Sequence, residues 1–315
     1  MEPSAARPAY AAPVPRAQPE TLTVDLPSGL HVSALTWGPE DGPLAVLLHG
    51  FPDTAHTWRH LGPVLAEDGW RVVAPFLRGY APTGLAPDGS YHVPALVHDT
   101  LALHAALGGD GRAVVVGHDW GALVAHGTGA AEHTPYAAAV AMAVPPAPAL
   151  FPRGLGDLPL LARQSLLSWY TVFHQLPLLP ERVFSAHVAR LWRAWSPGYD
   201  PGEDLEHLAA ARPDRAHRKA AIDYYRAAPR RGALPSTYAD LADTWLQLPR
   251  VPLLYLHGAR DGCLDSRFAA RLVELLPELP ARSRVEVVPS AGHFLQLERA
   301  DRVAALVRTF LAEVS

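Results

Sequence analysis

The sequence predicts an α/β fold in which a mostly parallel sheet of eight strands is interrupted by an all-helical insertion. From Thr21 to residue 145, short β-like segments alternate with longer helical segments. Residues 146–248 lose this alternation and contain Pro-broken helical stretches rich in Trp, Tyr and Arg, after which the alternation returns. Such a pattern is typical of one core with an insertion. We therefore expect residues 21–145 and 249–315 to form the core and residues 146–248 to form a helical cap.

Eight segments have the composition of strands. Residues 21–26 and 30–37 flank a turn-forming Pro-Ser-Gly segment, which predicts a β-hairpin. Continuous aliphatic runs such as Leu44–Leu48 and Val114–Val116 are typical of buried parallel strands. The other predicted strands are 71–74, 137–144, 251–256 and 284–288, and the predicted core helices are 55–67, 93–107, 121–132, 266–276 and 298–313.

Composition and charge exclude several classes of protein. Of 315 residues, 49% are hydrophobic and 18% charged, and the net charge of −4 gives no electrostatic case for binding nucleic acid or an anionic membrane. The longest apolar run, residues 137–144, is too short to span a bilayer. The single cysteine, Cys263, excludes an intrachain disulfide and favours a reducing compartment, so we expect a cytoplasmic protein. Residues 1–20, rich in Pro and Ala without an apolar signal region, are predicted to be a disordered or surface arm.

The strongest local motif is Gly-His-Asp-Trp-Gly at residues 117–121, between a Val-rich strand and an Ala-rich helix. Small residues at both ends permit the sharp strand-to-helix turn that presents a nucleophile, and the following helix directs its N–H groups at the central residue. That residue is Asp119, whose carboxylate can attack a saturated carbon and form an ester that water later cleaves. Alone, Asp119 could equally be a helix N-cap.

Two further residues favour a catalytic role for Asp119. Asp261 follows the strand predicted at 251–256, and His293 follows the last predicted strand in an Ala-Gly-His-Phe segment. Each alone has an ordinary explanation, because Asp-Gly is a turn signal and the chain has 16 histidines. Together they give the order nucleophile, acid, histidine, which is the chain order of an α/β-hydrolase fold in which the histidine is the general base.

The fourth part of the predicted site is a pair of backbone N–H groups. His-Gly-Phe-Pro at residues 49–52 follows a predicted strand. In this fold the loop at that place and the residue after the nucleophile each donate an N–H group to a developing oxyanion. We assign these donors to Phe51 and Trp120, and we expect His49 and His118 to be structural.

These motifs together resemble the epoxide hydrolase branch of the α/β-hydrolase superfamily. The resemblance runs from about Thr21 to the C-terminus and includes the segments at 49–52, 117–121 and 291–294 and the Arg-Gly-Tyr-Ala-Pro-Thr-Gly segment at 78–84. It implies hydrolysis of an epoxide to a vicinal diol through a covalent ester on the aspartate. No cofactor or metal is expected, because the chain lacks the Gly-rich nucleotide-binding, Cys-x-x-Cys and His-Glu-x-x-His motifs.

The resemblance also implies two cap tyrosines that hydrogen-bond the epoxide oxygen. The first lies five residues before a Gln that precedes a Pro-containing turn, which matches Tyr170. The second lies in an aromatic-Tyr-Arg segment, which matches Tyr225, with Tyr224 as its packing neighbour. A phenol with a pKa of about 10 stays protonated at neutral pH and can donate as the alkoxide forms. The predicted substrate pocket consists of Phe51, Trp120, Phe173, Tyr224 and Phe294.

Two alternative functions remain open from the sequence. Haloalkane dehalogenases also carry Gly-His-Asp-Trp-Gly, but their earlier motif reads His-Gly-Asn-Pro, with Asn at the position of Phe51. Fluoroacetate-type dehalogenases have Arg at the position of Trp120. A non-catalytic, ligand-binding relative would gain little from keeping Asp119, Asp261 and His293 together. Epoxide hydrolysis is therefore the favoured function, with a haloalkane dehalogenase or another hydrolase of this fold as the alternative.

Two positions depart from the family pattern. Phe76 stands where many relatives have Asp, and Ala81 stands where they have Gly. We interpret both as differences in loop packing. The expected partners are a small apolar epoxide and water, and the chain is expected to be a monomer or a homodimer. Cys263 is interpreted as a small buried residue near the acid loop rather than as a redox switch.

Overall fold

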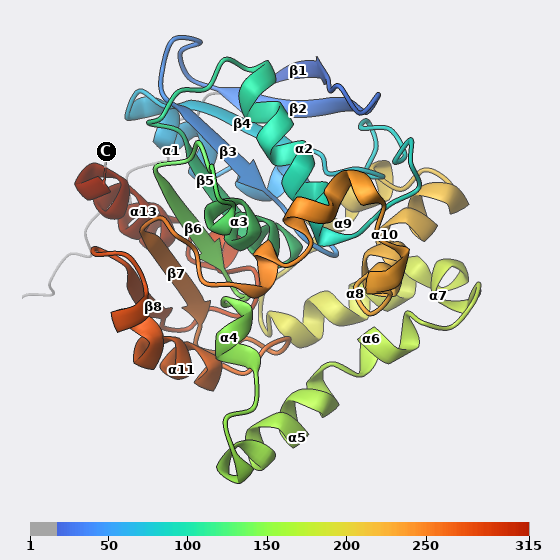
Figure 1. Ribbon diagram of the computed structural model, residues 1–315. Helices are drawn as coiled ribbons and strands as arrows, with labels where there is room; N and C mark the ends of the chain where they lie inside the picture. Colours follow the sequence, from blue (N-terminus) through green and yellow to red (C-terminus); the bar gives the residue numbers. More distant parts are fainter. Residues whose placement is uncertain (1–17, 315) are drawn as a thin grey trace, which may run out of the picture.

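The computed structural model describes residues 18–314 and confirms the mostly parallel eight-stranded sheet (Figure 1). The strand order is β1-β2-β4-β3-β5-β6-β7-β8. β2 is antiparallel to both of its neighbours, and all pairs from β4 to β8 are parallel. The strands are β1 (Glu20–Asp25), β2 (His31–Trp37), β3 (Leu44–Leu48), β4 (Arg71–Pro75), β5 (Val114–His118), β6 (Ala138–Met142), β7 (Leu253–Gly258) and β8 (Arg284–Val288).

The aliphatic strand segments form the centre of the core. Every residue of β3, β5, β6 and β7 is buried, as the unbroken hydrophobic runs indicate. The arm predicted at residues 1–20 lies largely outside the described residues, and Glu20 already belongs to β1. Among the residues that the structure describes, no helix combines the length and the apolar character needed to cross a lipid bilayer.

The core helices differ from the predicted ones at two places. The helix predicted at 55–67 is split into η1 (Ala55–Trp58) and α1 (Leu61–Glu67), because Pro63 would clash inside a continuous helix but fits the first turn of a new one. The last helix is preceded by a separate short turn of helix, α12. The core helices are α1, α2 (Val93–Ala106), α3 (Trp120–Ala130), α11 (Arg267–Leu275), the turn η6 (Leu276–Glu278), α12 (Leu295–Glu298) and α13 (Ala300–Val314).

The segment between β6 and β7 contains only helices and connecting loops, and we call it the helical insertion (residues 147–246). It lies beyond the carboxyl ends of the parallel strands (Figure 1). Its assignment as a separate cap domain stays a prediction. Its elements are α4 (Ala147–Leu150), η2 (Leu155–Asp157), α5 (Leu158–Leu167), α6 (Trp169–Phe173), α7 (Leu179–Arg182), α8 (Phe184–Trp195), α9 (Gly202–Ala210), α10 (Arg215–Ala227), η3 (Arg231–Ala233), η4 (Ser236–Leu241) and η5 (Thr244–Leu246).

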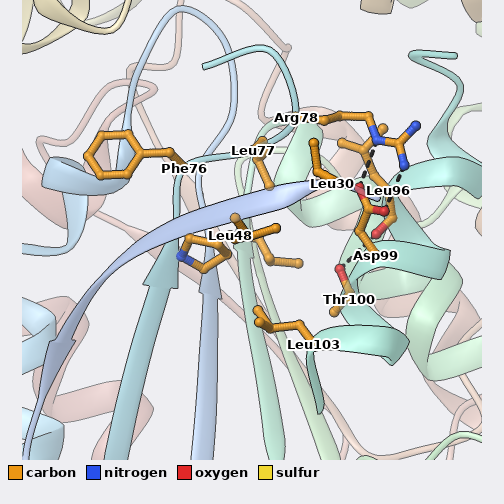
Figure 2. Close-up of a pocket in the computed structure, with 11 residues that line it drawn as sticks. Leu30, Leu48, Phe76, Leu77, Arg78, Leu96, Asp99, Thr100 and Leu103 are labelled. Atoms are coloured by element: carbon orange, nitrogen blue, oxygen red, sulfur yellow. Dashed lines mark hydrogen bonds and ion pairs between the residues drawn. The ribbon is translucent and has the colours of Figure 1, made fainter. Parts of the chain in front are cut away.

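A buried ion pair fixes the loop after β4. The Arg78 guanidinium donates two hydrogen bonds of 2.7 Å to the Asp99 carboxylate of α2 (Figure 2). The Arg78 carbonyl accepts a hydrogen bond of 2.9 Å from the hydroxyl of Tyr224 in the helical insertion. Phe76, at the position where many relatives have Asp, points away from this pair and packs edge-on against His56 with ring centroids 5.6 Å apart. The loop therefore joins the core to the helical insertion through Arg78 rather than through position 76.

We expect Arg78→Met to destabilise the protein by about 3–5 kcal/mol, because the substitution leaves the Asp99 carboxylate buried without its partner. Urea denaturation measures this loss. The matched control is Arg112→Met, because Arg112 and Asp110 form an exposed pair. A loss of stability no larger than that of the control would show that the buried pair does not support the loop.

Candidate active site

Asp119 lies at a strained turn between β5 and α3. Its φ of 53° and ψ of −114° place a non-glycine residue in a region that L-residues rarely adopt. A Cβ on Gly117 would lie 2.0 Å from the carbonyl oxygen of Gly121, and one on Gly121 would lie 2.1 Å from that of Leu48. The two glycines of the motif are thus required sterically, as the sequence predicts.

The Asp119 carboxylate faces a neighbouring backbone donor. The Phe51 N–H donates a 2.7 Å hydrogen bond to Asp119 Oδ1. Gly50 makes this approach possible, since a Cβ there would lie 2.4 Å from the same oxygen. The positive end of α3 also begins beside the carboxylate. Phe51 therefore occupies the place predicted for an oxyanion donor, whereas the role of the Trp120 N–H stays a prediction.

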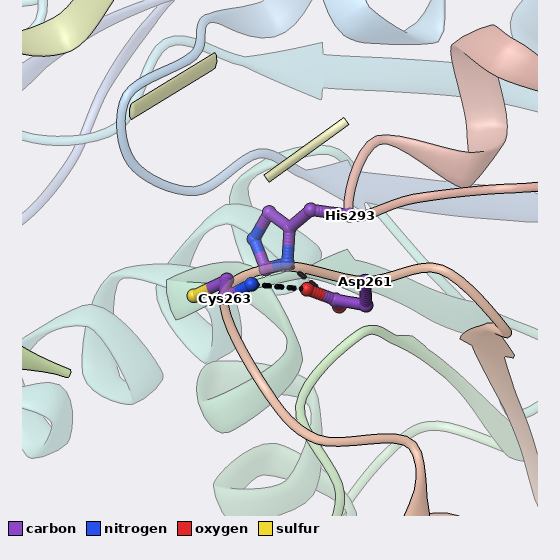
Figure 3. A group of neighbouring side chains, drawn as sticks. All are labelled: Asp261, Cys263 and His293. Carbon is purple, nitrogen blue, oxygen red and sulfur yellow. Dashed lines mark hydrogen bonds and ion pairs between the residues drawn. The ribbon is translucent and has the colours of Figure 1, made fainter. Parts of the chain in front are cut away.

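His293 lies between the two aspartates. Its Nδ1 is 2.9 Å from Asp261 Oδ2, and its Nε2 is 3.7 Å from Asp119 Oδ2, which is beyond hydrogen-bonding distance. Figure 3 shows Asp261 between His293 and Cys263, whose N–H donates to Asp261 Oδ1 over 2.7 Å. The Leu264 N–H donates to the same oxygen over 3.1 Å, so the carboxylate is held on both sides. The three predicted residues from three separate loops are therefore neighbours.

The two carboxylates control the charge of His293. Burial alone would lower the pKa of its imidazole, but Asp261 and Asp119 outweigh that effect and raise the pKa to about 10. His293 is therefore protonated at neutral pH.

The two histidines expected to be structural are buried and neutral. The Leu77 N–H donates to His49 Nε2 over 3.1 Å. His118 Nε2 lies 3.0 Å from the His293 carbonyl oxygen and supports that loop. Burial lowers the pKa of each imidazole to about 3, with nearby positive groups adding to the shift.

Both predicted tyrosines line the same cavity as Asp119. Tyr170 lies on α6 and Tyr225 on α10, and their rings are perpendicular with centroids 5.6 Å apart. The Tyr170 hydroxyl is 3.3 Å from Cys263 Sγ, whereas the Tyr225 hydroxyl has no hydrogen-bond partner among the described residues. Burial raises the pKa of both phenols well above 10, and the charge of Asp119 adds to this, so both remain proton donors.

The cavity has a volume of about 590 Å³ and also reaches Trp120 and Cys263. Apart from Asp119, the two tyrosines and the side chains of Thr171 and Gln175, its walls are mainly apolar. They include Leu123, Val144, Leu150, Val172, Ala228 and Leu264. The sequence does not distinguish these apolar residues from ordinary core residues. Which side of each helix faces the cavity depends on how the helical insertion packs on the core.

Of the five predicted pocket residues, only Trp120 lines this cavity. The Phe51 ring packs behind Tyr225 with centroids 5.1 Å apart, and Tyr224 turns its hydroxyl to the Arg78 carbonyl. Phe294 stacks on Trp192 at 3.4 Å between centroids, and Phe173 packs against His187. The assignment of these four side chains to the substrate pocket stays a prediction, since the structure shows only that each packs against a neighbouring ring or backbone group.

Asp261, Cys263 and His293 place one potential metal ligand each within 4.8 Å of one another. The oxygens of Asp261 already accept three hydrogen bonds, however. Burial also raises the pKa of the Cys263 thiol well above 9, and a thiol must lose its proton to bind a metal. The group is thus better suited to hydrogen bonding than to holding a metal.

The order of the strands and the turn at Asp119 define an α/β-hydrolase. Residues 43–300 match the family described as alpha/beta hydrolase fold. Epoxide hydrolase 3 of Xenopus tropicalis is 30% identical over 308 residues, covering 91% of this chain and 76% of that protein. Epoxide hydrolase A of Mycobacterium tuberculosis is 28% identical, covering 90% of this chain and 95% of that protein.

Solved structures of epoxide hydrolases are also similar to this chain. The crystal structure of epoxide hydrolase A from Mycobacterium thermoresistibile superposes with a TM-score of 0.71 at 25% identity, covering 94% of this chain and 99% of that chain. A structure from a study of novel epoxide hydrolases in metagenomes from hot environments gives a TM-score of 0.74 at 28% identity, covering 93% and 98%. The chain belongs to the epoxide hydrolase branch of the α/β-hydrolase family and is a hydrolase.

We expect Asp119→Asn to lower the pKa of His293 from about 10 toward its ordinary value of 6.5, because one of two neighbouring negative charges is lost. Titration of labelled histidine by NMR measures this shift. In the wild type the raised pKa stabilises the folded state fully below pH 6.5, and this stabilisation is lost as the pH rises through about 10. His126, whose pKa is lowered to about 4 by burial and has no contribution from Asp119 or His293, is the internal control. An unchanged pKa of His293 in the variant would show that the Asp119 carboxylate does not stabilise the protonated imidazole.

Proposed function

We propose that the protein hydrolyses epoxides to vicinal diols through a covalent ester on Asp119, with His293, Asp261, Tyr170 and Tyr225 as its catalytic partners. The observation that carries this proposal is the shared cavity, in which the Asp119 carboxylate and the two tyrosines line one space. An epoxide between them would have a nucleophile on one side and proton donors on the other, which is the arrangement needed for in-line ring opening.

In the first step a carboxylate oxygen of Asp119 attacks one epoxide carbon, and the bond from that carbon to the epoxide oxygen breaks. Tyr170 and Tyr225 bind that oxygen, and a phenol donates the proton that turns the alkoxide into a hydroxyl. The step consumes one proton in total. The phenolate left by this donation is reprotonated by His293, which is protonated in the free enzyme, and this transfer leaves the imidazole neutral.

Ester formation removes the charge of Asp119 and with it part of the support for the high pKa of His293. The imidazole, held at Nδ1 by Asp261, can then accept a proton from water at Nε2. The resulting hydroxide attacks the ester carbonyl, and the diol leaves. The second hydrogen of that water ends on the departing diol, Asp119 is again a carboxylate, and the proton taken from water stays on His293, which restores the starting state.

The backbone donors stabilise the tetrahedral intermediate of the second step. The Phe51 N–H already points at Asp119 Oδ1, and the Trp120 N–H is proposed as the second donor. Loss of one such donor typically costs about 2.7–4 kcal/mol of transition-state stabilisation. The apolar walls of the cavity support a small apolar epoxide as the substrate. The cytoplasmic location and the monomeric or homodimeric state stay predictions.

We expect His293→Gln to accumulate the ester, because ring opening still occurs while water is no longer activated. Mass spectrometry of the protein after mixing with styrene oxide should show the added mass of the substrate, located by peptide mapping on Asp119. The exposed His133→Gln should show no adduct and normal turnover. A diol that incorporates oxygen from labelled water in the first turnover would exclude the covalent route, whatever the effect of His293→Gln.

We expect Tyr225→Phe to reduce the rate of ring opening by about 10²- to 10⁴-fold, which is the usual contribution of a positioned acid. Single-turnover kinetics measure this rate. Tyr224→Phe is the matched control in the adjacent position, since the Tyr224 hydroxyl donates to the Arg78 carbonyl. The control should lower thermal stability while reducing the rate far less. Equal losses of rate in the two variants would contradict a specific role for the Tyr225 hydroxyl.

A further inference from the structure

Cys263 contacts one of the two tyrosines but not the reacting aspartate. It lies in the loop between β7 and α11, two residues after Asp261, and its Sγ is 3.3 Å from the Tyr170 hydroxyl. Both side chains are buried, with 4% of Cys263 and 6% of Tyr170 exposed, and both line the cavity. The Tyr225 hydroxyl, buried in the same wall, has no partner among the described residues. The two tyrosines therefore differ in their hydrogen bonding.

The backbone of Cys263 is fixed from two directions. Its N–H donates a 2.7 Å hydrogen bond to Asp261 Oδ1, and its carbonyl accepts a 2.9 Å hydrogen bond from the Gln164 side chain. Gln164 lies on α5 and also accepts from the Asp265 N–H over 3.0 Å. The position of the thiol is thus tied both to the acid loop and to the helical insertion that carries Tyr170.

A thiol is suited to a hydrogen bond that must break when the substrate binds. Sulfur is a weak donor and a weak acceptor, so its bond to a phenol costs little to break when an epoxide oxygen, and then an alkoxide, becomes available. A thiolate at this place would itself attack an epoxide. Burial raises the pKa of the Cys263 thiol well above 9, which keeps the group neutral and poorly nucleophilic.

We propose that Cys263 is a positioning residue that holds the Tyr170 hydroxyl in the free enzyme and releases it to the epoxide oxygen. This inference rests on the proposed function. It assigns different starting states to the two tyrosines: the proton of the Tyr225 hydroxyl has no acceptor among the described residues, whereas the Tyr170 hydroxyl is oriented by sulfur. Removing the thiol leaves the ring of Tyr170 packed but frees its O–H bond to rotate, so that the productive orientation of the hydroxyl has to be reached anew in each encounter with substrate.

The test is a double-mutant cycle on kcat/KM for styrene oxide. We expect Cys263→Ala to lower kcat/KM by about threefold to tenfold, as the loss of one weak hydrogen bond implies. In a Tyr170→Phe background the same substitution should cost nothing further, whereas in a Tyr225→Phe background it should cost the full factor. Cys263→Ser, which restores a hydrogen-bonding group, should recover most of the loss. Thermal unfolding of each variant confirms that the fold is retained.

A spectroscopic measurement tests the contact without any turnover. Because Cys263 is the only cysteine of the chain, its S–H stretching band in the infrared spectrum is unambiguous. Tyr170→Phe should shift this band toward that of a free thiol, and Tyr225→Phe should leave it in place. An unshifted band in Tyr170→Phe, or an equal loss from Cys263→Ala in both tyrosine backgrounds, would overturn the inference. If the band shifts but the enzyme does not open epoxides, the contact between Cys263 and Tyr170 is supported and only the proposed function is contradicted.

Discussion

The close approach of three backbone segments around Asp119 is the constraint on which the rest of the structure depends. Glycines at positions 50, 117 and 121 leave no room for a Cβ, and their contacts bring β3, β5 and α3 together at one point. This proximity forces Asp119 to a positive φ and brings the Phe51 N–H within 2.7 Å of its carboxylate. Backbone strain of this kind persists only where the surrounding packing over-determines it. Here the buried parallel strands supply that packing.

Charge balance is the second consequence of this geometry. Two buried carboxylates, Asp119 and Asp261, would be costly without compensation. Two backbone N–H groups and the His293 ring satisfy Asp261, whereas Asp119 has one backbone N–H, the end of a helix and a protonated imidazole 3.7 Å away. The support for Asp119 is thus partly ionic. A change in the charge of Asp119 therefore changes the pKa of His293 directly.

Sequence patterns were informative where local chemistry decides the structure. Aliphatic runs predict the buried strands, and the glycines around Asp119 predict the strained turn, because sterics at those places depend on near neighbours in the chain. The pocket walls were not predictable in this way. Phe294 stacks on Trp192 and Phe51 packs behind Tyr225, and both contacts depend on how the helical insertion docks on the core. An aromatic residue beside a motif gives no indication of which way its ring will turn.

That docking depends on a few buried polar contacts, which fix the helical insertion that carries both tyrosines. The Trp192 indole donates to the Pro52 carbonyl over 2.8 Å, beside the loop that supplies the Phe51 N–H. Ser196 accepts from the Phe294 N–H over 3.1 Å, next to His293. Each contact joins the helical insertion to a loop that contacts Asp119 or carries His293, rather than to a distant part of the core. Because a hydrogen bond restricts both distance and direction, these anchors fix the insertion more tightly than apolar packing alone would. Disturbing them should misplace Tyr170 and Tyr225 relative to Asp119 before it unfolds the protein.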